Sequence, residues 1–257
     1  AHMGAQGEAA IPTLIKALKV ENPELVWHAA NALGAISAKP DEVVPALTPL
    51  LKNSSPEVKA HAAIALGNFG SAAKSAVPEL IKLLADSELN VKLDAASALG
   101  SIGPDASSAV PALAKAMQDG PTALTLTSAS ALASIGKAAV PEVTKLLNKD
   151  SSLKLLAIHV LGEIGTESEE SIPELLKLTK SDDTDIRETA IVSLGEIGPK
   201  AIKAEPELIK ILENSTGTTR NKAVYALSKI GSKKALPLIK KYAESDSDDE
   251  RFRLVCA

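Results

Sequence analysis

The sequence holds a single cysteine, Cys256, among its 257 residues. One cysteine excludes an intramolecular disulfide framework and a zinc site built from several cysteines. Aromatic residues are also scarce, at 2% of the chain, so a core built around large rings is not available. The apolar side chains are mainly those of alanine, leucine, isoleucine and valine, a composition that favours closely packed helices.

A strong excess of charge is missing as well. The formal net charge is −4 at pH 7, whereas nucleic-acid-binding proteins usually carry a clear excess of basic residues. No apolar run approaches the roughly 20 residues that a membrane-spanning helix needs. We therefore predict neither a nucleic-acid partner nor a membrane partner. Residues 1–3 resemble a cloning scar, so the absence of a signal peptide carries no information about location.

What the chain does contain is a six-residue motif that recurs at regular intervals. The motif ALGSIG, from Ala98, has six close copies that begin at Ala32, Ala65, Ala131, Val160, Ser193 and Ala226. The leucine of each copy follows a proline by 20 or 21 residues, and the prolines are Pro12, Pro45, Pro78, Pro111, Pro141, Pro173 and Pro206, with an eighth at Pro237. Neighbouring prolines stand 30 to 33 residues apart, a period that is typical of a solenoid of stacked units.

Each unit reads as two helices. In the third copy, Pro78 suits the first turn of a helix because its fixed φ is helical and its missing N–H would be unpaired there. Asp86 and Ser87 are expected to end that helix and to cap the next. In the first two copies Asn22 and Ser55 take the capping place. The second helix carries its apolar residues at helical spacing, at Val91, Ala95, Ala96, Leu99 and Ile102, and Gly103 is expected to end it in the left-handed conformation.

This pattern, P-x-L-x-x-L-L…V-[KR]-x-x-A-A-x-A-L-G-x-I-G, resembles HEAT repeats in the short form of the phycobilisome-lyase-like HEAT family. The resemblance covers nearly the whole chain and implies an all-α fold. We predict a right-handed α-solenoid, an alpha-alpha superhelix of about eight HEAT-like helical hairpins. It forms one domain over residues 4–257, with units that start near residues 11, 44, 77, 110, 140, 172, 205 and 236.

The ends of the array lack polar capping repeats. Gly4 stands where the glycine of an upstream motif would fall, and the motif leucine after Pro237 would fall one residue beyond Ala257. We therefore expect a fragment of a longer array, or an array with unusual ends. The alternative is a native Met-Gly start together with a frayed native C-terminus. Gly136 lies only 5 residues before Pro141, which predicts a local change of superhelix angle between the fourth and fifth units.

Residues on the second helices are counted from the leucine of each motif. Positions −8, −4, −3, 0 and +3 are expected to be buried, and the resemblance implies that the opposite positions, −6, −5 and −2, face a concave groove. We call these three positions the second-helix face. Its candidate partner-binding residues are Trp27, His28, Asn31, His61, Ile64, Leu93, Leu126, Leu155, His159, Val192, Tyr225 and Phe252. So much apolar surface indicates a binding site, and the alternative is that these side chains pack on neighbouring helices.

Catalytic and metal chemistry find little support in the residues. His28 and His61 occupy the same position one unit apart, with helix backbones roughly 10 Å from each other, which is poor geometry for joint metal ligation without a third ligand. No histidine is followed by glutamate, although deoxyhypusine hydroxylases, whose fold is similar, bind iron through His-Glu pairs. The carboxylates of Asp94 and Glu188 read as isolated. We predict no catalytic residue, no metal and no cofactor.

A basic residue recurs at position −7, at Lys59, Lys92, Lys154, Arg187, Arg220 and Arg251. We expect these side chains to pair with acids of adjacent loops such as Asp86, Asp150 and Asp183. Binding of an acidic partner is the alternative.

We predict a non-enzymatic scaffold that binds a protein or peptide partner in the concave groove. The few charges of the face favour capture of an apolar peptide or helix. A monomer is expected, with end-to-end association through uncapped terminal repeats as a second form. Two other functions stay open. One is an accessory subunit of a bilin-lyase-type chromophore-processing enzyme, in which Trp27, His28 and His61 would contact a tetrapyrrole, and the other is a structural spacer in a larger multidomain protein.

Overall fold

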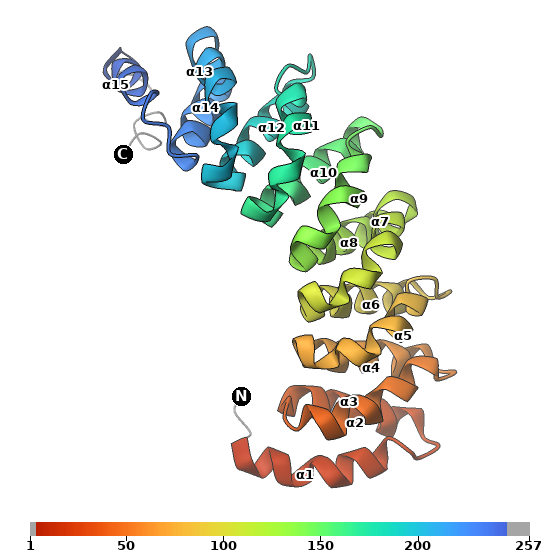
Figure 1. The fold of residues 1–257 in the computed structure, drawn as a ribbon. Helices are drawn as coiled ribbons and strands as arrows, with labels where there is room; N and C mark the ends of the chain where they lie inside the picture. Colours follow the sequence, from red (N-terminus) through yellow and green to blue (C-terminus); the bar gives the residue numbers. More distant parts are fainter. Residues whose placement is uncertain (1–3, 246–257) are drawn as a thin grey trace. The chain divides into compact units, whose positions relative to one another are not determined.

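The computed structural model describes residues 4–245, with the side chains of residues 7–242, and every regular element in that range is helical. The chain divides into two compact units, Ala1–Ala139 and Val140–Ala257. From here on, a unit is one of these two parts, and a single helical hairpin is called a repeat. The division falls in the short joint between Gly136 and Pro141. Each unit is a run of helical hairpins (Figure 1). The all-α repeat fold is therefore confirmed, and the single domain over residues 4–257 stays a prediction.

In the first unit, the α-helices are α1 Gly4–Ala17, α2 Pro23–Ile36, α3 Pro40–Leu47, α4 Pro56–Gly67, α5 Val77–Leu83, α6 Leu89–Ile102, α7 Val110–Asp119 and α8 Thr122–Ile135. Short 3-10 helices η1 Thr48–Lys52, η2 Gly70–Ala76, η3 Gly103–Ala109 and η4 Gly136–Ala139 lie between them. The second unit contains α9 Val140–Leu146, α10 Ser151–Ile164, η5 Gly165–Ser171, α11 Ile172–Leu178, α12 Thr184–Ile197, η6 Gly198–Ala204, α13 Glu205–Asn214, α14 Gly217–Lys229 and α15 Leu236–Ser245.

The second helices of successive repeats pack on one another. In the first unit α2 contacts α4, α4 contacts α6 and α6 contacts α8, and in the second unit α10 contacts α12 and α12 contacts α14. The motif makes this approach close, because the glycine after its leucine faces the alanine or serine before the leucine of the next copy. A Cβ atom on Gly34 would lie 2.7 Å from the Cα of Ala65, and one on Gly195 would lie 2.8 Å from the Cα of Ala226. We call these contacts the glycine seam.

Helix ends follow the sequence prediction at most places. The Asn22 side chain accepts a 3.0 Å hydrogen bond from the Glu24 N–H, and the Ser55 hydroxyl accepts a 3.4 Å bond from the Val58 N–H. Gly103 ends α6 with φ +71° and ψ −140°, so its φ is positive as expected, but its ψ is not left-handed helical. This backbone leads the chain directly into η3, and only glycine adopts it readily.

The predicted cap of α6 is wrong in part. The residue that precedes α6 is Glu88, whose side chain forms no capping bond. Asp86 accepts a 3.0 Å hydrogen bond from the Glu88 N–H, and the Ser87 hydroxyl is directed to the Asp86 carboxylate, 3.5 Å away, instead of to the helix.

The core follows most of the expected positions, and the one departure at position +3 is Ile36, which is half-buried. Positions −4, −3 and 0 are buried in every described repeat. Position −8 departs from the expectation twice: Leu25 is exposed while its neighbour Val26 is buried, and the half-buried Thr219 donates a hydrogen bond to Glu188.

One stretch, Thr122–Leu146, is long and apolar enough to cross a membrane by length and composition. Half of its most apolar window is buried inside the protein, and Gly136, at φ +76°, interrupts it between α8 and η4. Core side chains such as Leu132 and Val143 account for its apolar character. The stretch therefore gives no support for a membrane span.

Ser128 is the one polar exception at position −4, where the other copies carry alanine. Its side chain is fully buried and its hydroxyl finds no hydrogen-bond partner. Ser128→Ala is expected to raise the free energy of unfolding by about 1 kcal/mol, because it removes an unsatisfied buried polar group and adds a better helix former. Urea unfolding followed by circular dichroism measures the change.

Ser193→Ala is the matched control for this measurement. The Ser193 hydroxyl is also buried, but it donates a 2.9 Å hydrogen bond to the carbonyl of Ile158. Loss of this hydrogen bond is expected to lower the free energy of unfolding by about 1 kcal/mol. Equal effects of the two substitutions would contradict the assignment of Ser128 as unsatisfied.

Candidate partner-binding surface

The second-helix face reaches solvent in both units. Among the described candidate residues, four are exposed: His28, Ile64, Leu126 and His159. The others are half-buried: Trp27, Asn31, His61, Leu93, Leu155, Val192 and Tyr225. Ile64 and Leu126 are 38% and 55% exposed, which is unusual for large apolar side chains on packed helices. Phe252, the remaining candidate, lies outside the described residues.

The aromatic residues of the first two repeats form a stack. The Trp27 indole lies 3.6 Å from the His28 ring and 4.6 Å from the His61 ring, between centroids, with interplanar angles of 28° and 21°. The stack joins α2 to α4 across the repeat boundary. These histidines therefore lie against an indole, and no group of three or more His, Cys, Asp or Glu side chains suited to a metal occurs among residues 4–245.

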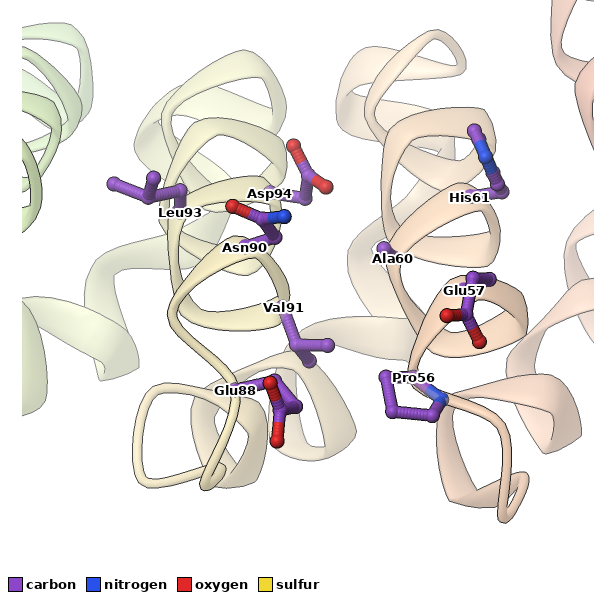
Figure 2. Close-up of a pocket in the computed structure, with 9 residues that line it drawn as sticks. All are labelled: Pro56, Glu57, Ala60, His61, Glu88, Asn90, Val91, Leu93 and Asp94. Carbon is purple, nitrogen blue, oxygen red and sulfur yellow. The ribbon is translucent and has the colours of Figure 1, made fainter.

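A cavity of about 360 Å³ lies next to this stack, between α4 and α6. Figure 2 shows Ala60 on the side of α4 that faces α6, and Asp94 and Asn90 on the side of α6 that faces α4. The cavity occurs here because position −6 is small: Ala60 stands where the neighbouring repeats have Trp27 and Leu93. Sequence reasoning missed the cavity, although the change of side-chain size at position −6 was a visible signal.

The pKa values of two carboxyl groups that line the cavity are shifted in opposite directions. Burial raises the pKa of Asp94, and the nearby His61 offsets this only in part. A hydrogen bond from Ser55 lowers the pKa of Glu57, whose side chain is exposed to solvent. Asp94 is therefore the carboxylate that is held away from water.

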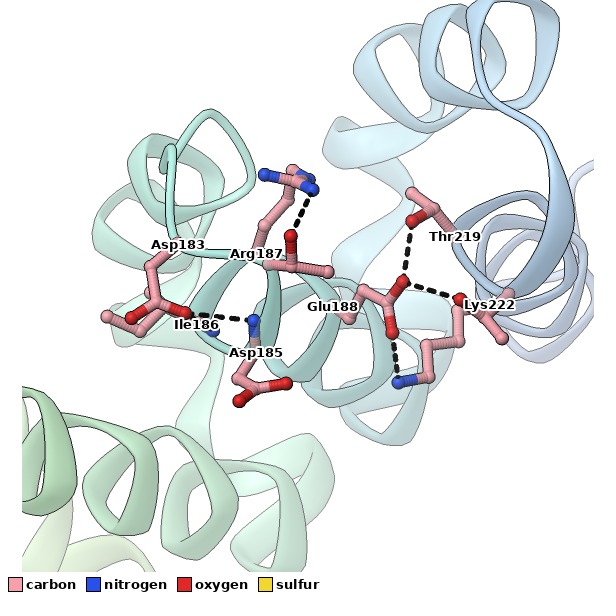
Figure 3. A network of polar contacts seen from close by, with 9 residues as sticks. Asp183, Asp185, Ile186, Arg187, Glu188, Thr219 and Lys222 are labelled. Carbon is pink, nitrogen blue, oxygen red and sulfur yellow. Dashed lines mark hydrogen bonds and ion pairs between the residues drawn. The ribbon is translucent and has the colours of Figure 1, made fainter.

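The second unit contains a polar network at the same position −6. The buried Glu188 carboxylate accepts hydrogen bonds from the hydroxyls of Thr218 at 2.9 Å and Thr219 at 2.6 Å, and it pairs with the Lys222 ammonium at 2.6 Å (Figure 3). Burial raises its pKa, but Lys222 and the two threonines outweigh this effect and lower the pKa to about 2. The expectation that Glu188 is isolated is wrong, because α14 of the next repeat supplies its partners.

Two candidates of the second unit, Tyr225 and His159, have polar partners within the chain. The Tyr225 hydroxyl donates a hydrogen bond to the Glu196 carboxylate, which raises the pKa of the phenol. The Lys229 ammonium lies 5.5 Å from the Tyr225 ring centroid, and His159 Nε2 lies 3.8 Å from the Glu163 carboxylate. The Tyr225 hydroxyl and ring are therefore already engaged by groups of the same chain.

The basic residues at position −7 behave in two ways. Lys59 forms the expected ion pair with Asp86, with both side chains largely buried. Arg187 instead donates to the carbonyl of Ser181 at 2.7 Å and to the hydroxyl of Thr184 at 2.9 Å. Asp183 is not its partner, because that carboxylate caps α12. Arg251 lies outside the described part of the chain.

The model of HEAT repeats matches residues 44–133, 110–189 and 172–255. The chain belongs to the HEAT-repeat family. Among solved structures, an engineered protein is similar over 96% of this chain and 76% of its own, at 24% identity and a TM-score of 0.57. That similarity shows the HEAT-like fold alone.

A second similar structure is the complex of CpcE and CpcF of phycocyanin lyase from Nostoc sp. PCC7120. It covers 90% of this HEAT-repeat chain and 92% of its own, at 23% identity and a TM-score of 0.49. A similarity of this extent carries no functional inference. The comparison with curated proteins gives no match.

Proposed function

We propose that this HEAT-repeat protein is a non-enzymatic scaffold that binds a protein or peptide partner on the second-helix face of its first unit. The observation that carries the proposal is the exposure of Ile64 and Leu126 at positions that face away from the core. Trp27 stands on the same face, and its ring is held by the two histidines. Protein interfaces commonly use aromatic side chains as anchors, with apolar side chains of the same surface around them.

The double variant Ile64→Asp/Leu126→Asp is expected to lose its partner, with an affinity at least about tenfold lower. Both side chains are exposed, so their replacement leaves the core intact. A carboxylate at each place opposes burial by an apolar partner. Capture from native lysate first identifies the protein that the wild type retains, and isothermal titration calorimetry with that purified protein then gives both affinities.

Val20→Asp/Ile202→Asp is the matched control. These two side chains are 41% and 44% exposed and lie outside the second-helix face. The control is expected to bind the partner as the wild type does, and circular dichroism verifies that both variants are folded. Equal affinities of all three proteins would exclude the second-helix face as the binding surface.

A further inference from the structure

A further cavity lies outside the second-helix face, where the third repeat meets the fourth. It has a volume of about 310 Å³ and is formed by α5 and α7 with the first turns of α6 and α8, which follow one another in the first unit (Figure 1). We propose that this cavity binds the C-terminal residue of a partner peptide, with an apolar side chain inside it and the free carboxylate beside two lysines.

The cavity exists because α7 carries alanine at two places where other first helices carry larger residues. Ala116 stands five residues after its proline, where four other repeats have leucine: Leu50, Leu83, Leu146 and Leu178. Ala112 stands directly after the proline, where four other repeats have glutamate: Glu79, Glu142, Glu174 and Glu207. The apolar wall consists of Ile81, Leu84 and Leu124. The volume is at the lower end of the range for ligand pockets, so it suits a single residue.

The alanine at position 112 also leaves Lys115 without the acid that its counterparts have. Lysines hold the same place in other repeats, each paired with the glutamate three residues before it: Glu79–Lys82, Glu142–Lys145 and Glu174–Lys177. In the fourth repeat that glutamate is replaced by Ala112. In the described part of the chain, no carboxylate pairs with Lys115, which lines the cavity.

Lys92, the second lysine of the lining, lacks its expected partner for a different reason. Its counterpart in the preceding repeat, Lys59, pairs with Asp86 in the loop after α5. Asp119 is the counterpart of Asp86, but α7 continues through Asp119 whereas α5 ends before Asp86. The Asp119 carboxylate accepts a 3.1 Å hydrogen bond from the Gln118 amide. No ion pair joins it to Lys92 among the described residues.

The lining therefore combines an apolar wall with a net charge of +1, from two lysines and one aspartate. A complementary ligand carries an apolar group and one carboxylate close together. The last residue of a peptide does so, because its side chain and its free carboxylate are attached to the same Cα atom. A carboxylate accepts several hydrogen bonds, so it can serve both ammonium groups, and such charge-assisted bonds are strong. A long acyl chain needs a larger space.

The test uses N-acetyl-leucine as the probe, titrated into the isotope-labelled full chain and followed by NMR. N-acetyl-leucine amide, which lacks only the free carboxylate, is the control ligand, and octanoate represents a fatty acid as the source of the carboxylate. Saturable shifts are expected at the backbone amides of residues 81–85 and 112–121, with a dissociation constant on the order of 1 mM. The amide is expected to leave these signals in place, and octanoate to bind more weakly than N-acetyl-leucine.

The charge of the site is tested by Lys115→Gln, which is expected to weaken the binding of N-acetyl-leucine about tenfold. Lys82→Gln is the matched control, since Lys82 holds the same place in the preceding repeat but does not line the cavity. It is expected to bind the probe as the wild type does. Ala112→Glu supplies Lys115 with the acid that the other repeats have, and it is expected to weaken binding as Lys115→Gln does.

The shape of the site is tested by Ala116→Leu, which fills the cavity and is expected to abolish binding. Leucine stands at the same place in four other repeats, so this variant is expected to fold, and circular dichroism verifies it.

Three results would each overturn the proposal: shifts that are absent or equal for the amide, binding that is unchanged in Lys115→Gln, and binding that survives Ala116→Leu. Octanoate that binds as tightly as N-acetyl-leucine or more tightly would overturn the peptide C-terminus as the ligand. The variant Ile64→Asp/Leu126→Asp is expected to bind N-acetyl-leucine as the wild type does, since neither side chain lines the cavity. The cavity and the second-helix face are therefore tested separately.

Discussion

Gly34→Ala is expected to lower the free energy of unfolding by about 1–3 kcal/mol, although alanine is the better helix former. The added Cβ would lie 2.7 Å from the Cα and 2.9 Å from the Cβ of Ala65 in the next repeat. Because the nearest atom belongs to the backbone, a side-chain rotation cannot relieve the overlap, and α2 must move away from α4. The separation of the helices costs more than the roughly 1 kcal/mol that helix propensity returns.

The measurement is urea unfolding followed both by circular dichroism and by the fluorescence of Trp27, which lies on the same helix. Ala35→Gly provides the control at the adjacent, exposed position. Propensity alone predicts that Gly34→Ala stabilises and that Ala35→Gly destabilises by about 1 kcal/mol. The glycine seam predicts that both destabilise, so a more stable Gly34→Ala protein would refute the seam.

Glu188→Gln is expected to lower stability at pH 7 by about 1–3 kcal/mol, because it leaves Lys222 without its anion and weakens the bonds from Thr218 and Thr219. The effect depends on pH in a defined direction. The folded-state pKa of Glu188 is about 2, below its ordinary value of 4.5. The contribution of this carboxylate is therefore fully present above about pH 5 and is lost as the pH falls toward 2.

Urea unfolding of the wild type and of Glu188→Gln between pH 7 and pH 2 measures this difference. The two proteins are expected to differ at neutral pH and to converge in acid, since protonation of Glu188 in the wild type then removes the same charge. Glu213→Gln, at an exposed carboxylate of α13, is the control and is expected to follow the wild type. A difference that stays constant down to pH 2 would show that Glu188 keeps an ordinary pKa.

The repeat pattern was sufficient to predict two α-helices in each repeat. The prolines, the Asn22 and Ser55 caps and the terminal Gly103 are local signals, and each acts within a few residues along the chain. The 3-10 helices such as η2 were not predicted, because short alanine- and serine-rich joints carry no apolar periodicity. The burial of the face positions was predictable only in part: the count from the motif places Leu93 nearer the surface than Leu99, but Ala60 and Glu188, at the same position −6, are buried.

The contacts between repeats were not predictable from one copy at a time. Glu188 read as isolated because its partners lie about 30 residues later, in the first turns of α14. Arg187 was expected to pair with a carboxylate, but the carbonyl groups at the end of the preceding loop lie closer to it. The partner of a charged side chain depends on the distances between groups in the folded structure. Those distances cannot be read from the residues of one repeat.

The glycine seam also affects how the number of repeats can change during evolution. Each of the first three repeats presents a glycine, and the next repeat meets it with an alanine, as Gly67 meets Ala98 and Gly100 meets Ala131. A repeat whose two packing surfaces match in this way can be duplicated or deleted, because its neighbours then meet through the same glycine–alanine contact. The fourth repeat carries Ala133 in place of the glycine, so lengthening by unequal recombination is compatible with the first three repeats and is disfavoured directly after the fourth.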